Sequence, residues 1–134
     1  ETKPRSIVSD FARLEAIFMI EHSPASTYDE LKETTAFLLD FYNSERLDKF
    51  PETKYTGSYQ AIMDRNINLT RKMRTYAFES SEEDTNLAPY YFALLEWILP
   101  IVCYSSAHEN KQQLSMIVSG MLCNKVVGML RLEI

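Results

Sequence analysis

The sequence predicts an all-α fold, a single-domain bundle of about five helices. Apolar residues recur at spacings of three and four along most of the chain, which is the period of an amphipathic helix. Only three glycines and five prolines occur, and neither Asn-Gly nor Asp-Gly, the strongest hairpin signals, is present. Because 134 residues suit one hydrophobic core, we expect residues 1–134 to be one helical domain. The first residue is not Met, so we expect this domain to be excised from a longer chain.

The charge balance argues against nucleic acid as a partner. The chain carries a net charge of -5, whereas proteins that bind phosphate backbones need an excess of Lys and Arg on one face. The local basic cluster of Arg71, Lys72 and Arg74 spreads around most of a helical turn, so we expect it to face solvent. With 46% hydrophobic and 25% charged residues, the composition is that of a globular protein.

The first two helices are expected over residues 6–22 and 28–47. Thr27 and Glu30 form a capping-box pattern at the start of the second helix, in which each side chain satisfies a backbone N–H group. The apolar stripe of the first helix comprises Ile7, Phe11, Leu14 and Phe18, and that of the second comprises Tyr28, Leu31, Leu38 and Tyr42.

A third helix is expected after Gly57, and its apolar stripe contains one polar residue, Asn66. We expect Asn66 to be buried and to hydrogen-bond to a neighbouring helix, as single buried Asn residues do when they fix helix register. Contact with a ligand is the alternative. The predicted stripe comprises Tyr59, Ile62, Asn66, Leu69, Met73 and Tyr76.

An acidic, exposed loop is expected at residues 80–86, where no apolar residue is present to be buried. Ser80 and Ser81 each have an acidic residue three positions later, which resembles the pattern that acidophilic kinases prefer. At the end of the loop, Thr85 or Asn86 is expected to cap the next helix.

The most apolar run, residues 90–104, predicts a central helix with a kink. Pro100 cannot donate a hydrogen bond to the carbonyl of Glu96, four residues earlier, so we expect the helix to bend between these two residues. The run is too short to cross a bilayer and contains a charge. We therefore expect no transmembrane segment here.

Three placements of Glu96 fit this apolar helix. We favour a solvent-facing position, with the aromatic residues of the helix covering its other sides. In the second, the carboxylate is buried and paired with an Arg or Lys of the third helix, because an unpaired buried charge is too costly. In the third, Glu96 is a functional carboxylate in a groove, with a raised pKa.

The last helix is expected over residues 107–132, capped by Ser106 and Glu109, and paired with the kinked helix. Gly120, Asn124 and Gly128 recur at a spacing of four, and small residues so placed let another backbone approach closely. That backbone belongs either to a second copy of the chain or, in the interpretation that we slightly favour, to this chain wrapped around a central helix. The predicted apolar face comprises Leu114, Ile117, Val118, Met121, Leu122, Val126, Met129 and Leu130.

Several common chemistries find no support in the sequence. There is no Glu-x-x-His for a di-iron bundle, no H-E-x-x-H, no C-x-x-C and no glycine-rich phosphate loop. Cys103 and Cys123 lie among apolar residues, so we expect both thiols to be reduced, buried and not bonded to each other. Together with His22 and His108 they match no common zinc spacing, and we predict no metal, no cofactor and no catalytic residue.

By elimination, the leading hypothesis is a non-enzymatic adaptor or scaffold domain that binds a partner protein, a peptide helix or a second copy of itself. The binding surface would be an apolar helix face or groove, because the helices carry more apolar surface than five short helices can hide. We expect an intracellular location, in the cytoplasm or the nucleus. The candidate partner-binding residues are Glu96, Trp97, Gly120, Asn124 and Gly128.

Two other functions stay open at this level. Asn68-Leu69-Thr70 is a glycosylation sequon, which keeps a secreted, cytokine-like helical bundle as the alternative. A small enzyme that uses Glu96 with Tyr and His partners is the third hypothesis.

Overall fold

A computed structural model describes residues 4–44, 50, 54–80, 87–103 and 108–132. Within this part of the chain there are five α-helices and no strand, which confirms the all-α prediction. A π-helix, η1, continues the first α-helix, and a 3-10 helix, η2, continues the fourth. The elements are α1 (Pro4–Ala16), η1 (Ile17–Glu21), α2 (Tyr28–Phe41), α3 (Gln60–Ser80), α4 (Ala88–Ile98), η2 (Leu99–Cys103) and α5 (Glu109–Leu132).

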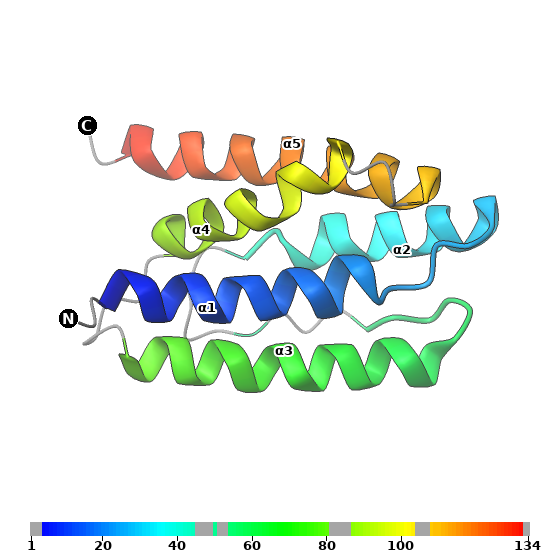
Figure 1. The fold of residues 1–134 in the computed structure, drawn as a ribbon, viewed down its shortest axis with the longest axis horizontal. Coiled ribbons are helices and arrows are strands. Elements are labelled where there is room, and N and C mark those ends of the chain that lie inside the picture. The colour runs from blue at the N-terminus through cyan, green and yellow to red at the C-terminus, as the bar shows by residue number, and fades with distance from the viewer. Residues whose placement is uncertain (1–3, 45–49, 51–53, 81–86, 104–107, 133–134) are drawn as a thin grey trace.

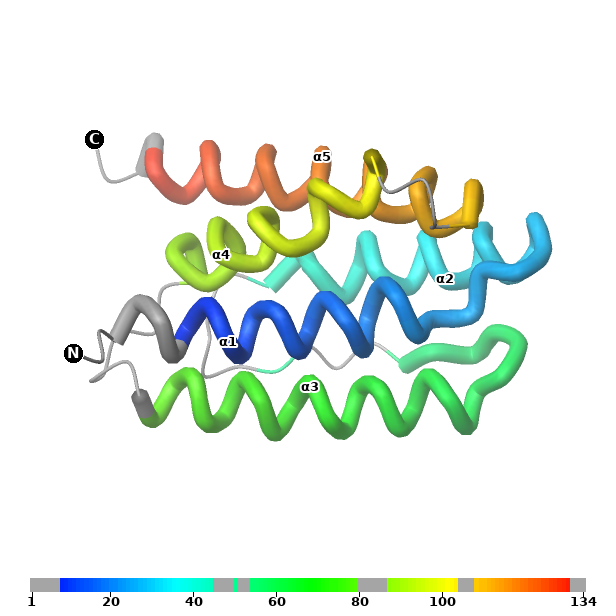
Figure 2. Tube along the Cα trace, in the orientation of Figure 1, coloured from blue at the N-terminus to red at the C-terminus, as the bar shows by residue number. Residues whose placement is uncertain are grey.

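The helices lie side by side along the long axis of the molecule (Figure 1). α1 packs against α3 on one side and α4 on the other, and α4 in turn packs against α5. α4 and α5 run antiparallel as neighbours, as the colours in Figure 2 show. α5 also packs against α2, but it forms one edge of the bundle (Figure 1). The interpretation of α5 as a helix covered on all sides was therefore wrong.

The capping box at the start of α2 is confirmed. The Thr27 hydroxyl accepts from the Glu30 backbone N–H at 3.1 Å, and the Glu30 carboxylate accepts from the Ser26 backbone N–H at 3.1 Å. The carboxylate thus reaches one residue further back than the standard box. α2 ends at Phe41, earlier than the predicted residue 47.

The buried faces of α1 and α3 differ from the predicted stripes. Leu14 of α1 is 36% exposed, and Tyr59, Ile62 and Tyr76 are more exposed still. The predictions followed the largest apolar side chains, whereas the inner faces combine alanines, Met and Ile with buried polar residues. The buried residues of α1 and η1 are Ala12, Glu15, Ala16, Met19 and Ile20, and those of α3 are Met63, Asn66, Ile67, Thr70, Arg74 and Ala77.

Asn66 behaves as predicted. It is fully buried, and its side-chain N–H donates to the backbone carbonyl of His22, at the end of η1, at 3.2 Å. This bond fixes how far α3 can slide along α1 and η1.

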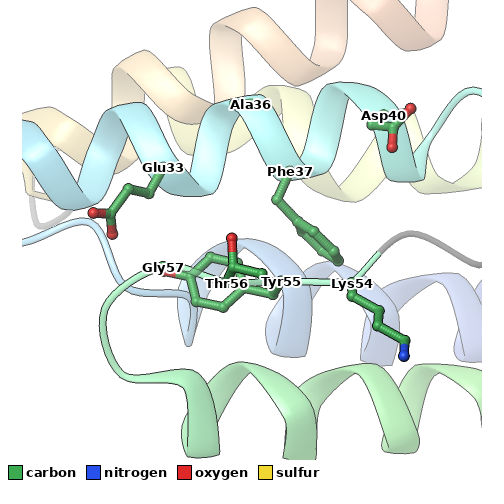
Figure 3. A pocket seen from close by; sticks show the side chains of 8 residues that line it. All are labelled: Glu33, Ala36, Phe37, Asp40, Lys54, Tyr55, Thr56 and Gly57. Atoms are coloured by element: carbon green, nitrogen blue, oxygen red, sulfur yellow. The ribbon is translucent and has the colours of Figure 1, made fainter.

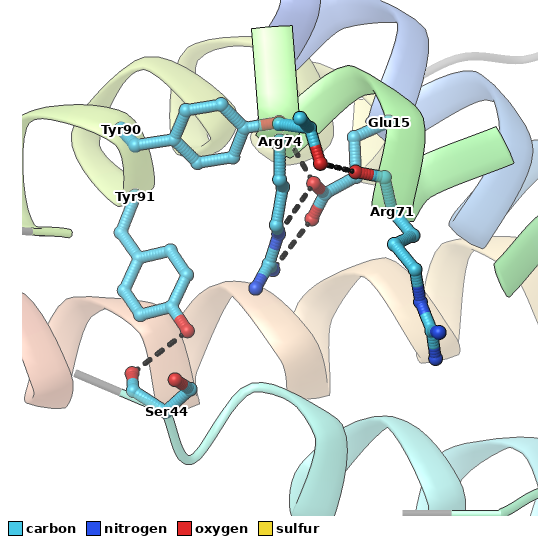
Figure 4. Close-up of polar contacts among 7 residues, drawn as sticks. Glu15, Ser44, Arg71, Arg74, Tyr90 and Tyr91 are labelled. Carbon is cyan, nitrogen blue, oxygen red and sulfur yellow. Dashed lines mark hydrogen bonds and ion pairs between the residues drawn. The ribbon is translucent and has the colours of Figure 1, made fainter. Parts of the chain in front are cut away.

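Arg74 contradicts the expected solvent-facing basic cluster, because it is buried and forms an ion pair with Glu15 of α1 (Figure 4). Its Nε and Nη2 atoms donate to the two carboxylate oxygens at 2.9 and 3.0 Å, and the Tyr90 hydroxyl donates to the same carboxylate at 2.7 Å. Burial, followed by the Glu15 charge, raises the pKa of Tyr90 well above its usual value. Five aromatic rings lie within 6 Å of the guanidinium carbon, those of Phe41, Tyr42, Phe50, Tyr90 and Tyr91.

The interruption predicted at Pro100 is confirmed. The α-helical pattern of α4 ends at Ile98, and the chain continues as the tighter helix η2 through Pro100 to Cys103. Leu87 occupies the cap position of α4 and makes no side-chain capping hydrogen bond, whereas the predicted cap residues Thr85 and Asn86 lie outside the described residues.

α5 begins at Glu109, two residues later than predicted, and its described part ends at Leu132. The expected cap residue Ser106 is outside the described residues. His108 takes the capping role, since its ring Nδ1 accepts from the Asn110 backbone N–H at 3.0 Å. The Lys111 ammonium ties this end of α5 to η1 by donating to the carbonyl of Ile20 at 2.8 Å and to that of Ser23.

Candidate functional site

The five predicted site residues fall on two neighbouring helices and are all exposed. Glu96 and Trp97 lie on α4, whereas Gly120, Asn124 and Gly128 lie on α5. The exposed position of Glu96 agrees with the placement that we favoured from the sequence.

Trp97 is engaged by α1. Its indole N–H donates to the Ser9 hydroxyl at 3.2 Å, and the Arg13 guanidinium lies 5.1 Å from the ring centroid. These contacts fasten α4 to α1, so Trp97 already has a structural role within the chain.

The outer side of α5 is not covered by the other helices of the described chain. It carries four exposed apolar side chains: Met116 is 59% exposed, Ile117 43%, Val127 46% and Leu130 48%. Isolated exposed apolar residues are normal on a protein surface, whereas contiguous exposed apolar patches are typical of interaction surfaces. We define the outer face of α5 as Gln113, Met116, Ile117, Gly120, Cys123, Asn124, Val127, Gly128 and Leu130.

The outer face carries no formal charge. From Gln112 to Leu130 the sequence contains one charged residue, Lys125, and that residue is half-buried on the flank of α5. A solvated helix face normally carries charged side chains, so this composition sets α5 apart from an ordinary surface helix.

The two glycines of α5 pack against nothing within the described chain. A Cβ atom built at Gly120 or Gly128 meets no atom within 4 Å. Close packing inside the bundle therefore does not explain these glycines. An interior glycine costs about 1 kcal/mol of helix stability relative to Ala, and no contact of the described chain compensates for it.

The sequence predicted only part of the division of α5 into a buried and an exposed side. Ile117 and Leu130 were assigned to the core but are exposed, and Met116 and Val127 were missed. Their spacing around Gly120 and Asn124 was the available signal, because these residues share one side of a 3.6-residue helix. The buried residues on the inner side are Leu114, Ser115, Val118, Ser119, Leu122, Val126 and Met129.

The cysteines are unpaired, as predicted, but their predicted burial was wrong. Cys103, at the end of η2, and Cys123, on the outer face of α5, are both free and exposed. Both were placed in the core because of apolar sequence neighbours. Although the residues beside Cys123 in the sequence are apolar, Cys123 itself lies on the exposed side of α5.

A pocket of about 430 Å³ lies between α2 and the segment 54–57 (Figure 3). Glu33, at one end, accepts from the Ser58 backbone N–H at 2.7 Å, so its carboxylate already holds the segment in place. A Cβ atom at Gly57 would lie 2.5 Å from the Tyr55 hydroxyl oxygen, which explains the glycine there. None of the predicted site residues lines the pocket. The lining residues are Glu33, Ala36, Phe37, Asp40, Lys54, Tyr55, Thr56 and Gly57.

No three His, Cys, Asp or Glu side chains among the described residues are grouped closely enough to hold a metal ion. The stretch Glu109–Leu130 is long and apolar enough to cross a membrane, judged by length and composition alone, and 39% of that window is buried inside the bundle. Its buried side is built from core residues such as Leu114 and Val118.

Comparison with protein-family models, with curated proteins and with solved structures finds no match to this chain.

Proposed function

We propose that this chain is a non-enzymatic interaction domain, an adaptor or scaffold, that binds protein on the outer face of α5. The observation that carries the proposal is the uncharged outer face itself, with exposed apolar side chains at Met116, Ile117, Val127 and Leu130. Binding a partner there would bury this apolar surface, which is the main driving force of protein association. Glycines in the same face would let a partner helix approach the α5 backbone closely.

The chemistry of the face favours protein over other partners. A nucleic acid or an anionic lipid surface would be recognised by Lys and Arg, and the outer face has neither. We also propose an intracellular location, supported by two cysteines that are unpaired.

A secreted, cytokine-like bundle is the alternative proposal. The observation in its favour is that Asn68 of the sequon is exposed on α3, although the sequon Thr70 is buried. A shift in mass on glycosidase treatment of the natural protein would favour this alternative, and an unchanged mass would count against it.

Site-specific photocrosslinking tests the proposed function. Benzoylphenylalanine is placed at Val127 of the full-length protein, which is expressed in the cells that naturally make it. The matched control carries the probe at Asn68, an exposed residue of α3. We expect a discrete protein adduct from position 127 that is absent from position 68, and that disappears when Asn124→Glu is added to the chain. No discrete adduct at position 127, or the same adducts at both positions, would contradict the proposal.

A further inference from the structure

We infer that the partner on the outer face of α5 is a second copy of this chain, related by a two-fold axis close to Asn124. The inference rests on the proposed function, because it names the occupant of the same surface. Its support comes from the charges, the spacing and the extent of that surface.

The charges favour self-pairing over a partner of different sequence. A chain with a net charge of -5 repels its own copy at most surfaces. From Gln113 to Leu130 the outer face adds no charge of its own to this repulsion, so two copies can meet there without placing charged side chains against each other. Interfaces between different proteins commonly use complementary charges for recognition, and this face offers none.

The spacing of the residues suits a two-fold axis. Gly120 and Gly128 lie four residues on either side of Asn124, and the space over both glycines is open. In a symmetric pair, residue i of one copy meets residue j of the other, and j meets i. An axis at Asn124 therefore brings Asn124 against its own copy and puts glycines on both sides of the crossing, whether the two helices run parallel or antiparallel. Two facing amide side chains can hydrogen-bond to each other.

The extent of the face predicts a weak dimer. From Gln113 to Leu130 the outer face is about 27 Å long, at 1.5 Å per residue. A helix pair of that length buries on the order of 1,000 Å² in total, which is near the lower limit for a specific interface. We therefore expect a dimer that forms at micromolar concentration and dissociates on dilution.

Charge substitutions at the symmetric position give a sharp test. Asn124→Glu and Asn124→Lys are made separately, and the sedimentation of each purified chain is compared with that of the mixture and of the wild type. We expect the wild type to form a dimer and each variant alone to associate at least about tenfold more weakly. In the equimolar mixture we expect association to recover, because only the mixture pairs opposite charges. Asn68→Glu and Asn68→Lys are the matched controls, and neither should change association. Because Asn124 is exposed, all variants should keep the circular dichroism of the wild type.

Three results would overturn the inference: a wild-type chain that stays monomeric, variants that associate as well as the wild type, or a mixture that associates no better than its components. None of these results decides the proposed function, which the photocrosslinking at Val127 tests separately. A crosslinked adduct of different sequence at Val127 would still support an interaction domain. A monomeric wild-type chain together with no adduct at Val127 would contradict both the dimer and the proposed interaction surface.

Discussion

The ion pair between α1 and α3 and the outer face of α5 reverse the usual distribution of polarity. Glu15 and Arg74 are charged, yet both are almost completely buried. Met116 and Val127 are apolar, yet about half of each side chain is exposed. The polar group is tolerated inside because its partners lie close by, and the apolar group stays outside because the chain supplies nothing to cover it.

In these two regions the partners available to a side chain, more than its residue type, decide whether it lies inside or outside. The Glu15 carboxylate accepts three hydrogen bonds, two from Arg74 and one from Tyr90, and aromatic rings surround the guanidinium. Buried charges persist when they are paired in this way. The outer face of α5 has no such partners within the described chain, and this is the physical reason for expecting an external partner.

Breaking the ion pair should give the largest effect. Glu15→Ala leaves the Arg74 guanidinium buried without its counter-ion, and we expect the free energy of unfolding to fall by about 3–5 kcal/mol. Urea denaturation followed by circular dichroism measures the change. A loss below about 1 kcal/mol, the range of an exposed ion pair, would show that the pair is solvated.

Replacing both partners should be milder than removing one. In the double variant Glu15→Leu, Arg74→Met no charge is left unpaired, so we expect it to be more stable than Glu15→Ala alone. The Tyr90 hydroxyl loses its acceptor in both variants, so that loss cancels in the comparison. A double variant less stable than the single variant would mean that shape, and not charge pairing, dominates at this site.

Replacing the glycines of the outer face by Ala should raise the free energy of unfolding. Gly120→Ala and Gly128→Ala should each stabilise the monomer by about 1 kcal/mol, because Ala is the better helix former and its Cβ meets open space. Denaturation at a concentration low enough to keep the chain monomeric measures this gain. Destabilisation by either substitution would place the glycines against another part of the chain, and the contrast with the core would fail.

The pH dependence of stability concerns Lys111, which is half-buried where α5 meets η1. Burial lowers its pKa from 10.5 to about 8, against the opposing effect of Glu21 and Glu30. Between these values the unfolded chain binds more protons than the folded chain, so stability should rise with pH from about 8 towards 10. Above pH 10 it should fall, because burial raises the pKa of Tyr42 and Tyr90 and only the unfolded chain ionises them readily.

A matched variant isolates the lysine contribution. Lys111→Met should abolish the rise between pH 8 and 10 while keeping the fall above it. Denaturation midpoints of both proteins across this range give the comparison. Parallel curves for the two proteins would mean that Lys111 titrates as an ordinary exposed lysine.

The sequence predicted what depends on local signals. Helical periodicity gave the fold class, the Thr27 box gave the start of α2, and Pro100 gave the end of α4. These features are set by a few neighbouring residues, so they can be identified without tertiary contacts.

The rest depends on contacts between distant residues. One of the placements considered for Glu96 was a buried carboxylate paired with a basic residue of the third helix, and the structure makes that pair with Glu15, 59 residues away from Arg74. Nothing in the local pattern of α1 distinguishes Glu15 from a solvent-facing acid. The prediction of which α5 residues are buried was partly wrong for a similar reason. Apolar periodicity alone does not reveal which of two apolar sides a neighbouring helix covers.

The reactivity of the Cys123 thiol tests most directly whether the outer face of α5 is open in a single chain. With Cys103→Ser to remove the other thiol, the rate of reaction with a maleimide is compared between the folded and the urea-unfolded chain, at a concentration where the chain is monomeric. Because Cys123 is exposed on that face, we predict a folded-state rate close to the unfolded one, and a slower rate when the concentration is raised and a second copy covers the face. A thiol protected at every concentration would contradict the account, because the face would then be part of the core.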